Sequence, residues 1–179
     1  MPGVWVFPGG VVELDGVDRH AATAAGALDA DHPTTFEGDA DAEELAHRAC
    51  AIRELGEEAG ISLPADAELR PWSRWITPER SALRFDTRFY VALAPPHSPP
   101  KADGVEMIDA GWFAPQQALE QNEAGELDLV FPTIKHLEEL APFATADAVM
   151  AAAVDRPIQA VMPRIDGDGG REILPYLPD

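Results

Sequence analysis

The stretch RELGEEAGI, Arg53–Ile61, decides the fold of this chain, together with FPGG at Phe7–Gly10 far upstream. On an α-helix, residues three and four positions apart share a face, so Glu54, Glu57 and Glu58 are predicted to point the same way. Like charges this close repel one another unless a cation lies among them. Carboxylate oxygens are the ligands that hard divalent cations such as Mg²⁺ or Mn²⁺ prefer. The stretch therefore predicts a metal site.

Paired glutamates on a helix are often no more than a solvated surface, so the surrounding positions decide between the two interpretations. Arg53 directly precedes the first glutamate, and the apolar residues Leu55 and Ile61 stand where the helix must face a core. Gly60 is suited to the left-handed residue that commonly ends a helix. These positions agree with a single structured motif, and we therefore favour the metal site.

Arg53–Ile61 resembles the second half of the Nudix box, Gly-x5-Glu-x7-Arg-Glu-U-x-Glu-Glu-x-Gly-U with U aliphatic, and Gly10 looks like the opening glycine. In the family the arginine follows that glycine by 14 positions, whereas here it follows by 43, so 29 additional residues split the box. The family's early box glutamate falls on Leu45. The chain is similar to a branch of Nudix hydrolases, including peroxisomal acyl-CoA diphosphatases, in which the box is interrupted at this place.

The resemblance implies the architecture. We expect a single domain over residues 1–179, an α/β/α sandwich with a mixed β-sheet that lacks its N-terminal strand or strands. Either the start codon was assigned too late or the fold tolerates a gap in the sheet. The insertion, residues 15–41, is rich in Ala, Asp and Gly, which predicts a mobile surface loop or, alternatively, a flap over the substrate. A helix and a hairpin extend the domain over residues 145–179.

The resemblance also assigns roles to residues. It implies a metal shell of helix carboxylates and one backbone carbonyl, those of Glu54, Glu57, Glu58 and Gly10. Arg53 is expected to orient the carboxylates. The proton of the attacking water is expected to pass to Glu54, to Glu57 or to a downstream carboxylate such as Glu106, which stands shortly before a predicted tryptophan-containing strand. The alternative for Glu106 is an ordinary surface residue.

A candidate substrate-binding face lies in the segment Leu83–Leu93. Alternate residues of a strand face opposite sides, so Arg84, Arg88 and Tyr90 share one face with Asp86. Two arginines and an aromatic ring are suited to holding phosphate and stacking on adenine. The alternative, which we leave open, is that Asp86 simply neutralises the two arginines.

The remaining elements follow from periodicity and from Gly and Pro punctuation. Residues 42–59 are predicted to be helical with an apolar face containing Leu45, Ala49, Ile52 and Leu55. We expect further helices over 115–124, 131–140 and 145–154, and strands over 4–7, 107–113, 158–162 and 171–174. Cys50 is expected to be a small packing residue and not a nucleophile.

Composition excludes several classes of function. The 179 residues include 13 basic and 32 acidic side chains, for a net charge of −19, which disfavours binding to nucleic acid and to anionic membranes. A single cysteine excludes an internal disulfide and is compatible with a reducing compartment. Neither a signal peptide nor a long apolar run is present, so we expect a cytoplasmic location.

We therefore expect metal-assisted hydrolysis of a diphosphate linkage in a nucleoside diphosphate derivative. The resemblance implies CoA or acyl-CoA as the substrate, cleaved to 3′,5′-ADP and a phosphopantetheine. The alternatives are ADP-ribose or a nucleotide sugar as the substrate, or a catalytically silent Nudix-like binding domain. Family members are often dimers, which makes a homodimer possible.

Overall fold

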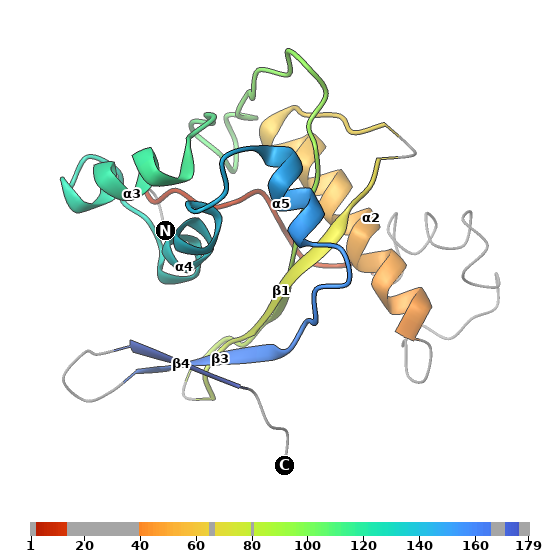
Figure 1. The fold of residues 1–179 in the computed structure, drawn as a ribbon, viewed down its shortest axis with the longest axis vertical. Helices are drawn as coiled ribbons and strands as arrows, with labels where there is room; N and C mark the ends of the chain where they lie inside the picture. The colour runs from red at the N-terminus through yellow and green to blue at the C-terminus, as the bar shows by residue number, and fades with distance from the viewer. Residues whose placement is uncertain (1–2, 14–39, 65–66, 80, 166–170, 176–179) are drawn as a thin grey trace. The chain divides into compact units, whose positions relative to one another are not determined.

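A computed structural model of the chain describes residues 3–13, 40–64, 67–79, 81–165 and 171–175 (Figure 1). The predicted insertion at 15–41 lies almost entirely outside these residues. The pattern of contacts divides the chain into two compact units: residues 1–67 with 94–146, and residues 68–93 with 147–179. No helix among the described residues is both long and apolar enough to cross a membrane.

The described part of the first unit includes the helices α2 (Ala40–Ala59), α3 (Pro115–Glu123) and α4 (Phe131–Leu140). Helices α3 and α4 each have a proline in their first turn, where the missing N–H costs no helical hydrogen bond. Gly125, with a φ of 74°, follows the end of α3. The positions of all three helices agree with the sequence prediction.

Helix α2 buries a different face from the one that its large apolar residues predict. Five buried residues recur every four positions, Ala42, Ala46, Cys50, Glu54 and Glu58, and Ala59 at the end of the helix is buried as well. The predicted face containing Leu45, Ala49 and Ile52 is only half-buried. Small side chains on the buried face let another segment approach the helix closely, which explains why Cys50 serves as packing, as expected.

The N-terminal segment was predicted to be a strand over residues 4–7, which is wrong. The segment instead forms one isolated parallel bridge, Trp5 to Leu129, with the Trp5 N–H donating to the carbonyl of Asp128 at 2.8 Å. Trp5 and Phe113 meet edge to face with ring centroids 5.0 Å apart. Both rings pack against a core cluster of Ala118, Leu127 and Leu137. This cluster fixes the start of the chain to the α3–α4 pair.

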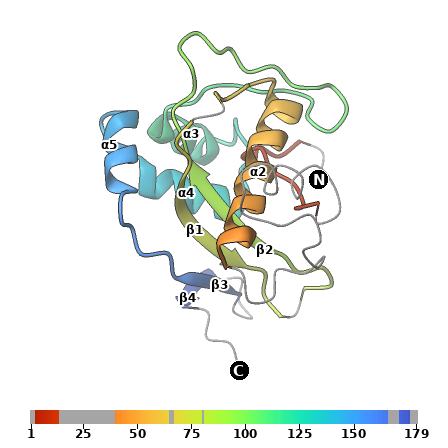
Figure 2. The same cartoon turned by 90° about the vertical axis from the view of Figure 1, so that its right-hand side faces the viewer.

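The second unit is built on a four-stranded mixed sheet in the order β2-β1-β3-β4. The strands are β1 (Arg70–Ile76), β2 (Asp86–Val91), β3 (Ala160–Ile165) and β4 (Arg171–Pro175). Strand β1 pairs antiparallel with β2, beside which it runs in Figure 2, and parallel with β3. Strands β3 and β4 form the predicted C-terminal hairpin, whose connecting residues lie outside the described part.

Two strand predictions differ from the structure. Strand β1 was not predicted, although Trp72, Trp75 and Ile76 are its buried residues. The predicted strand over residues 107–113 is wrong, because these residues form an irregular loop. Ile108 and Trp112 are exposed there, at 81% and 63%. Helix α5 (Ala146–Ala152) agrees with its prediction, and the carbonyl of its Met150 accepts a hydrogen bond from Arg70 at 2.6 Å.

Candidate active site

The carboxylates of α2 lie against the glycine bend, as the sequence predicts. The Gly9 N–H donates a hydrogen bond to Glu58 Oε2 at 2.7 Å. A Cβ placed on Gly10 would stand only 2.1 Å from Glu54 Oε1, so the carboxylate fills the space that the absent side chain leaves. Glu54 and Glu58, which lie 44 or more positions away in sequence, therefore contact the bend directly.

Arg53 binds two of the carboxylates at once. Its Nη1 donates to Glu54 Oε1 at 2.8 Å and to Glu57 Oε2 at 2.9 Å. Its Nη2 donates to the carbonyl of Val11 at 3.3 Å, so the same guanidinium also ties the helix to the segment after the bend. The orienting contacts expected of Arg53 are present. Glu57 is largely exposed, with 60% of its side chain accessible, so a ligand can reach it from solvent.

The electrostatic field at Glu58 favours a positive partner. Burial raises the pKa of the Glu58 carboxyl above its ordinary value, and the hydrogen bond from Gly9 opposes this rise. The charges of Glu54, Glu106 and Asp103 raise the pKa of Glu58 further. Glu106, which the sequence singled out, and Asp103, which it did not, therefore both act electrostatically on Glu58.

The donor set fits a hard divalent cation in its chemistry, because it consists of several carboxylates beside a backbone bend. In this conformation the carboxylates do not form a complete set of metal ligands. Among the described residues, no three Asp, Glu, His or Cys side chains are gathered closely enough to hold a metal ion. Because Arg53 engages Glu54 and Glu57, a cation would require at least one of these side chains to change its rotamer.

The predicted substrate-binding residues lie in the second unit. Arg88 and Tyr90 are on β2, and Arg84 precedes this strand and donates from Nε to the carbonyl of Thr77 at 3.1 Å. The Asp86 carboxylate is bound by Arg74 of β1, with distances of 2.9 and 2.5 Å. The partner found for Asp86 is thus a cross-strand arginine that the sequence analysis did not consider. Substrate binding by Arg84, Arg88 and Tyr90 stays a prediction.

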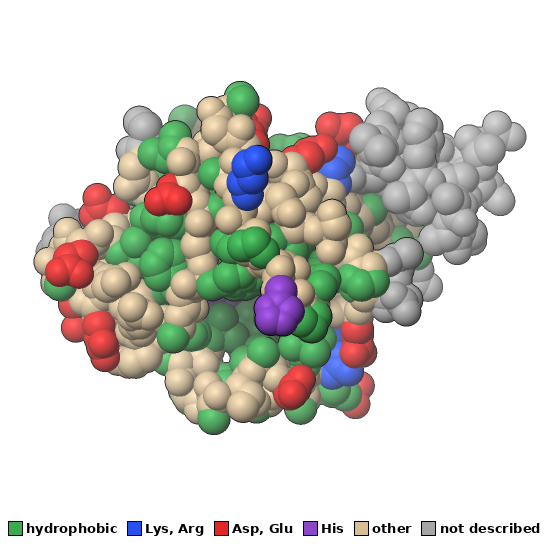
Figure 3. Space-filling view, turned by 90° about the horizontal axis from the view of Figure 1, so that it is seen from above, with side chains coloured by type: hydrophobic (Ala, Val, Ile, Leu, Met, Phe, Trp, Pro, Cys, Tyr) green, Lys and Arg blue, Asp and Glu red, His purple; other side chains and the backbone are tan. Residues whose placement is uncertain are grey.

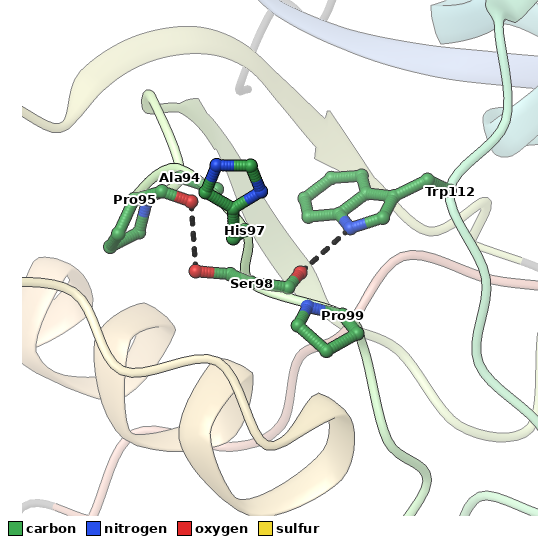
Figure 4. Close-up of a pocket in the computed structure, with 6 residues that line it drawn as sticks. All are labelled: Ala94, Pro95, His97, Ser98, Pro99 and Trp112. Atoms are coloured by element: carbon green, nitrogen blue, oxygen red, sulfur yellow. Dashed lines mark hydrogen bonds between the residues drawn. The ribbon is translucent and has the colours of Figure 1, made fainter.

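Hydrophobic side chains reach the molecular surface at many points (Figure 3). In the first unit, an open groove of about 650 Å³ is lined by Ala94, Pro95, His97, Ser98, Pro99 and Trp112. The indole N–H of Trp112 points to the Ser98 carbonyl, to which it donates at 2.9 Å (Figure 4). The Ser98 hydroxyl donates to the Pro95 carbonyl at 2.8 Å. The groove has a mainly apolar wall and no carboxylate.

A NUDIX domain model matches residues 17–133, which is more than half of the chain. The match begins after Gly10. Among curated relatives, an acyl-coenzyme A diphosphatase, NUDT19, of Homo sapiens is 26% identical over an alignment of 262 residues that covers 100% of this chain and 69% of the relative. NUDT19 of Gallus gallus is 27% identical over 175 residues, covering 65% of this chain and 46% of the relative.

Among solved structures, a NUDIX hydrolase from Alicyclobacillus acidocaldarius superposes with a TM-score of 0.65 at 23% identity, covering 84% of this chain and 81% of that one. The predicted Nudix-type α/β fold with a mixed sheet is confirmed. The split motif on α2, the fold and the match over residues 17–133 all agree. The chain therefore belongs to the Nudix hydrolase family.

Proposed function

We propose that this chain hydrolyses the diphosphate linkage of CoA or acyl-CoA, releasing 3′,5′-ADP and phosphopantetheine or its acyl derivative, with Mg²⁺ or Mn²⁺ as cofactor. The observation that carries the proposal is the contact of the α2 carboxylates with the glycine bend, where Glu58 accepts from Gly9 and Glu54 packs on Gly10. The names of the NUDT19 relatives support the substrate.

Each residue of the site has its own role in the proposed hydrolysis. Glu54, Glu57, Glu58 and the Gly10 carbonyl would hold the cation, which when bound neutralises phosphate charge and lowers the pKa of a water molecule. Arg53 holds Glu54 and Glu57 in place until these side chains would bind the cation. Glu57 or Glu106, both exposed, accepts the proton of the attacking water. The bond between the attacked phosphorus and the bridging oxygen breaks as the water oxygen adds.

The groove beside Trp112 supports an acyl-CoA over ADP-ribose or a nucleotide sugar. The groove is in the same unit as the carboxylates, and its wall offers apolar surface without carboxylate charge. Its loop continues to Lys101, whose N–H donates to the carbonyl of Ala59 at the end of α2 at 2.8 Å. A ligand with phosphates at one end and an apolar arm at the other would match these two surfaces.

The test is a panel of CoA, acyl-CoA esters, ADP-ribose and nucleotide sugars with Mg²⁺ or Mn²⁺, with product release measured by chromatography. We expect 3′,5′-ADP from CoA substrates, none of it after chelation, and a kcat in Glu57→Gln lower by at least about 100-fold, as is typical for loss of a general base. Glu123→Gln, an exposed change on α3, is the matched control and should be silent.

Turnover of ADP-ribose or a nucleotide sugar in place of the CoA substrates would contradict the proposed substrate. Tight substrate binding without turnover would instead support a silent binding domain, which the Leu45 departure from the box favours. Unchanged activity in Glu57→Gln would contradict the role given to the α2 carboxylates.

A further inference from the structure

The turn Asp103–Met107 is closed by one carboxylate. Asp103 Oδ1 accepts hydrogen bonds from the backbone N–H groups of Met107 at 2.8 Å, Val105 at 3.1 Å and Glu106 at 3.2 Å. Its Oδ2 also lies 3.2 Å from the Glu106 nitrogen. Gly104 has a φ of 76°, which permits the reversal, and its N–H donates to the Met107 carbonyl at 2.9 Å. The conformation of the turn thus depends on Asp103.

The base of this turn is attached to the end of α2. The Lys101 N–H donates to the Ala59 carbonyl at 2.8 Å, and Ala59 directly follows Glu58. The next residue, Gly60, has a φ of 63°, and a Cβ there would stand 3.3 Å from the Lys101 carbonyl oxygen. The turn therefore starts from a fixed point one residue beyond the helix carboxylates.

Glu106 is exposed and lies in this turn, five residues after Lys101, whose N–H donates to the Ala59 carbonyl. The charges of Glu106 and Asp103 also contribute to raising the pKa of Glu58. The backbone N–H groups of Met107, Val105 and Glu106 lower the pKa of Asp103 below its ordinary value. Asp103 is therefore ionised at neutral pH, with its oxygens engaged by its own turn.

We propose that Asp103 is a positioning residue, whose carboxylate fixes the backbone of the turn so that Glu106 is held beside the carboxylates of α2. The inference rests on the proposed function, in which Glu106 receives a proton or completes the metal shell. Val105, in the middle of the turn, is 85% exposed, so burial of this side chain does not hold the turn in place.

The experiment compares Asp103→Ala, Asp103→Asn, Glu106→Gln and the Asp103→Ala/Glu106→Gln double variant on acyl-CoA with Mg²⁺. Asp103→Ala is expected to lower kcat about 10–100-fold, the usual effect of losing a group that orients a ligand, with little change in KM. Asp103→Asn keeps one accepting oxygen and is expected to recover most of the activity. The double variant is expected to be no slower than Glu106→Gln, because no carboxylate is left to position.

Asp109→Ala is the matched control, since it removes a carboxylate of the same loop that accepts a hydrogen bond from the adjacent Ala110 N–H. A second measurement is independent of activity: in the metal-free protein, amide exchange of residues 105–107 should be faster in Asp103→Ala and unchanged in Asp109→Ala.

The outcomes separate this inference from the proposed function. A wild-type chain that hydrolyses no CoA substrate overturns the proposed function and this inference with it. An active wild type whose Asp103→Ala variant keeps its kcat, or a double variant in which the two losses multiply, overturns only the positioning role. An equal loss of kcat in Asp109→Ala would also overturn only the positioning role, because the loss would then come from the change in net charge.

Discussion

Replacing Gly10 by alanine tests the contact between the bend and the helix most directly. The new Cβ would lie 2.1 Å from Glu54 Oε1 and 2.4 Å from its carboxyl carbon. Ordinary carbon contacts lie near 3.5 Å, so the Glu54 carboxylate must move by about 1 Å or more. That movement disrupts the 2.8 Å bond to Arg53, in which both side chains are largely buried.

The size of the effect follows from this displacement. Misplacing a reacting group by about 1 Å can cost on the order of 100-fold in rate, and we expect a loss of kcat of that order in Gly10→Ala. Losing a hydrogen bond between charged groups costs about 2 kcal/mol, which in a chain of this size lowers Tm by about 4–8 °C. The assays are 3′,5′-ADP release at saturating acyl-CoA and thermal unfolding.

Gly9→Ala is the control for Gly10→Ala, because a Cβ on Gly9 meets nothing within 4 Å. This variant should keep its activity and its Tm. If Gly10→Ala were as active and as stable as Gly9→Ala, the packing of Glu54 on the bend would not matter for either property, and the reasoning would fail.

Two further predictions concern the groove and the buried carboxyl. Trp112→Ala should raise KM for long-chain acyl-CoA about 10-fold, because each methylene that loses apolar contact costs up to about 0.8 kcal/mol. KM for CoA should not change in Trp112→Ala, and Trp112→Phe should keep its activity. An equal rise in KM for CoA would refute acyl binding in the groove. Because the folded-state pKa of Glu58 is raised, the native state binds more protons than the unfolded state between the ordinary and raised values, so metal-free stability should fall as pH rises through this window. In Glu58→Gln, which keeps an acceptor for Gly9, that fall in Tm should be smaller, and an unchanged pH profile would contradict the pKa argument.

Local sequence was sufficient wherever a single element carries the information. Gly60 and Gly125 mark helix ends, with φ values of 63° and 74°, as glycines past a helix terminus are expected to do. Prolines at the starts of α3 and α4 likewise placed those helices. The spacing of Glu54, Glu57 and Glu58 predicted a shared face, and two of the three meet the glycine bend.

Local sequence failed where the partner decides the outcome. Apolar composition predicted strands over residues 4–7 and 107–113, but a strand requires a neighbour along its length. Among the residues that the structure describes, Trp5 has one only at a single bridge with Leu129. Strand β1 was not predicted, because it is a strand through its pairing with β2 and β3 on its two sides, which its own residue pattern does not reveal.

The amino-acid sequence by itself determined the family, the helix that carries the carboxylates and the glycine bend that they meet, because these are encoded in residue type and helical spacing. Only the tertiary structure decided which face of α2 is buried, that Arg74 is the partner of Asp86, and that the loop at Lys101 is attached to the end of α2. Each of these depends on which segments distant in the chain come together, and no local pattern of residues specifies that choice.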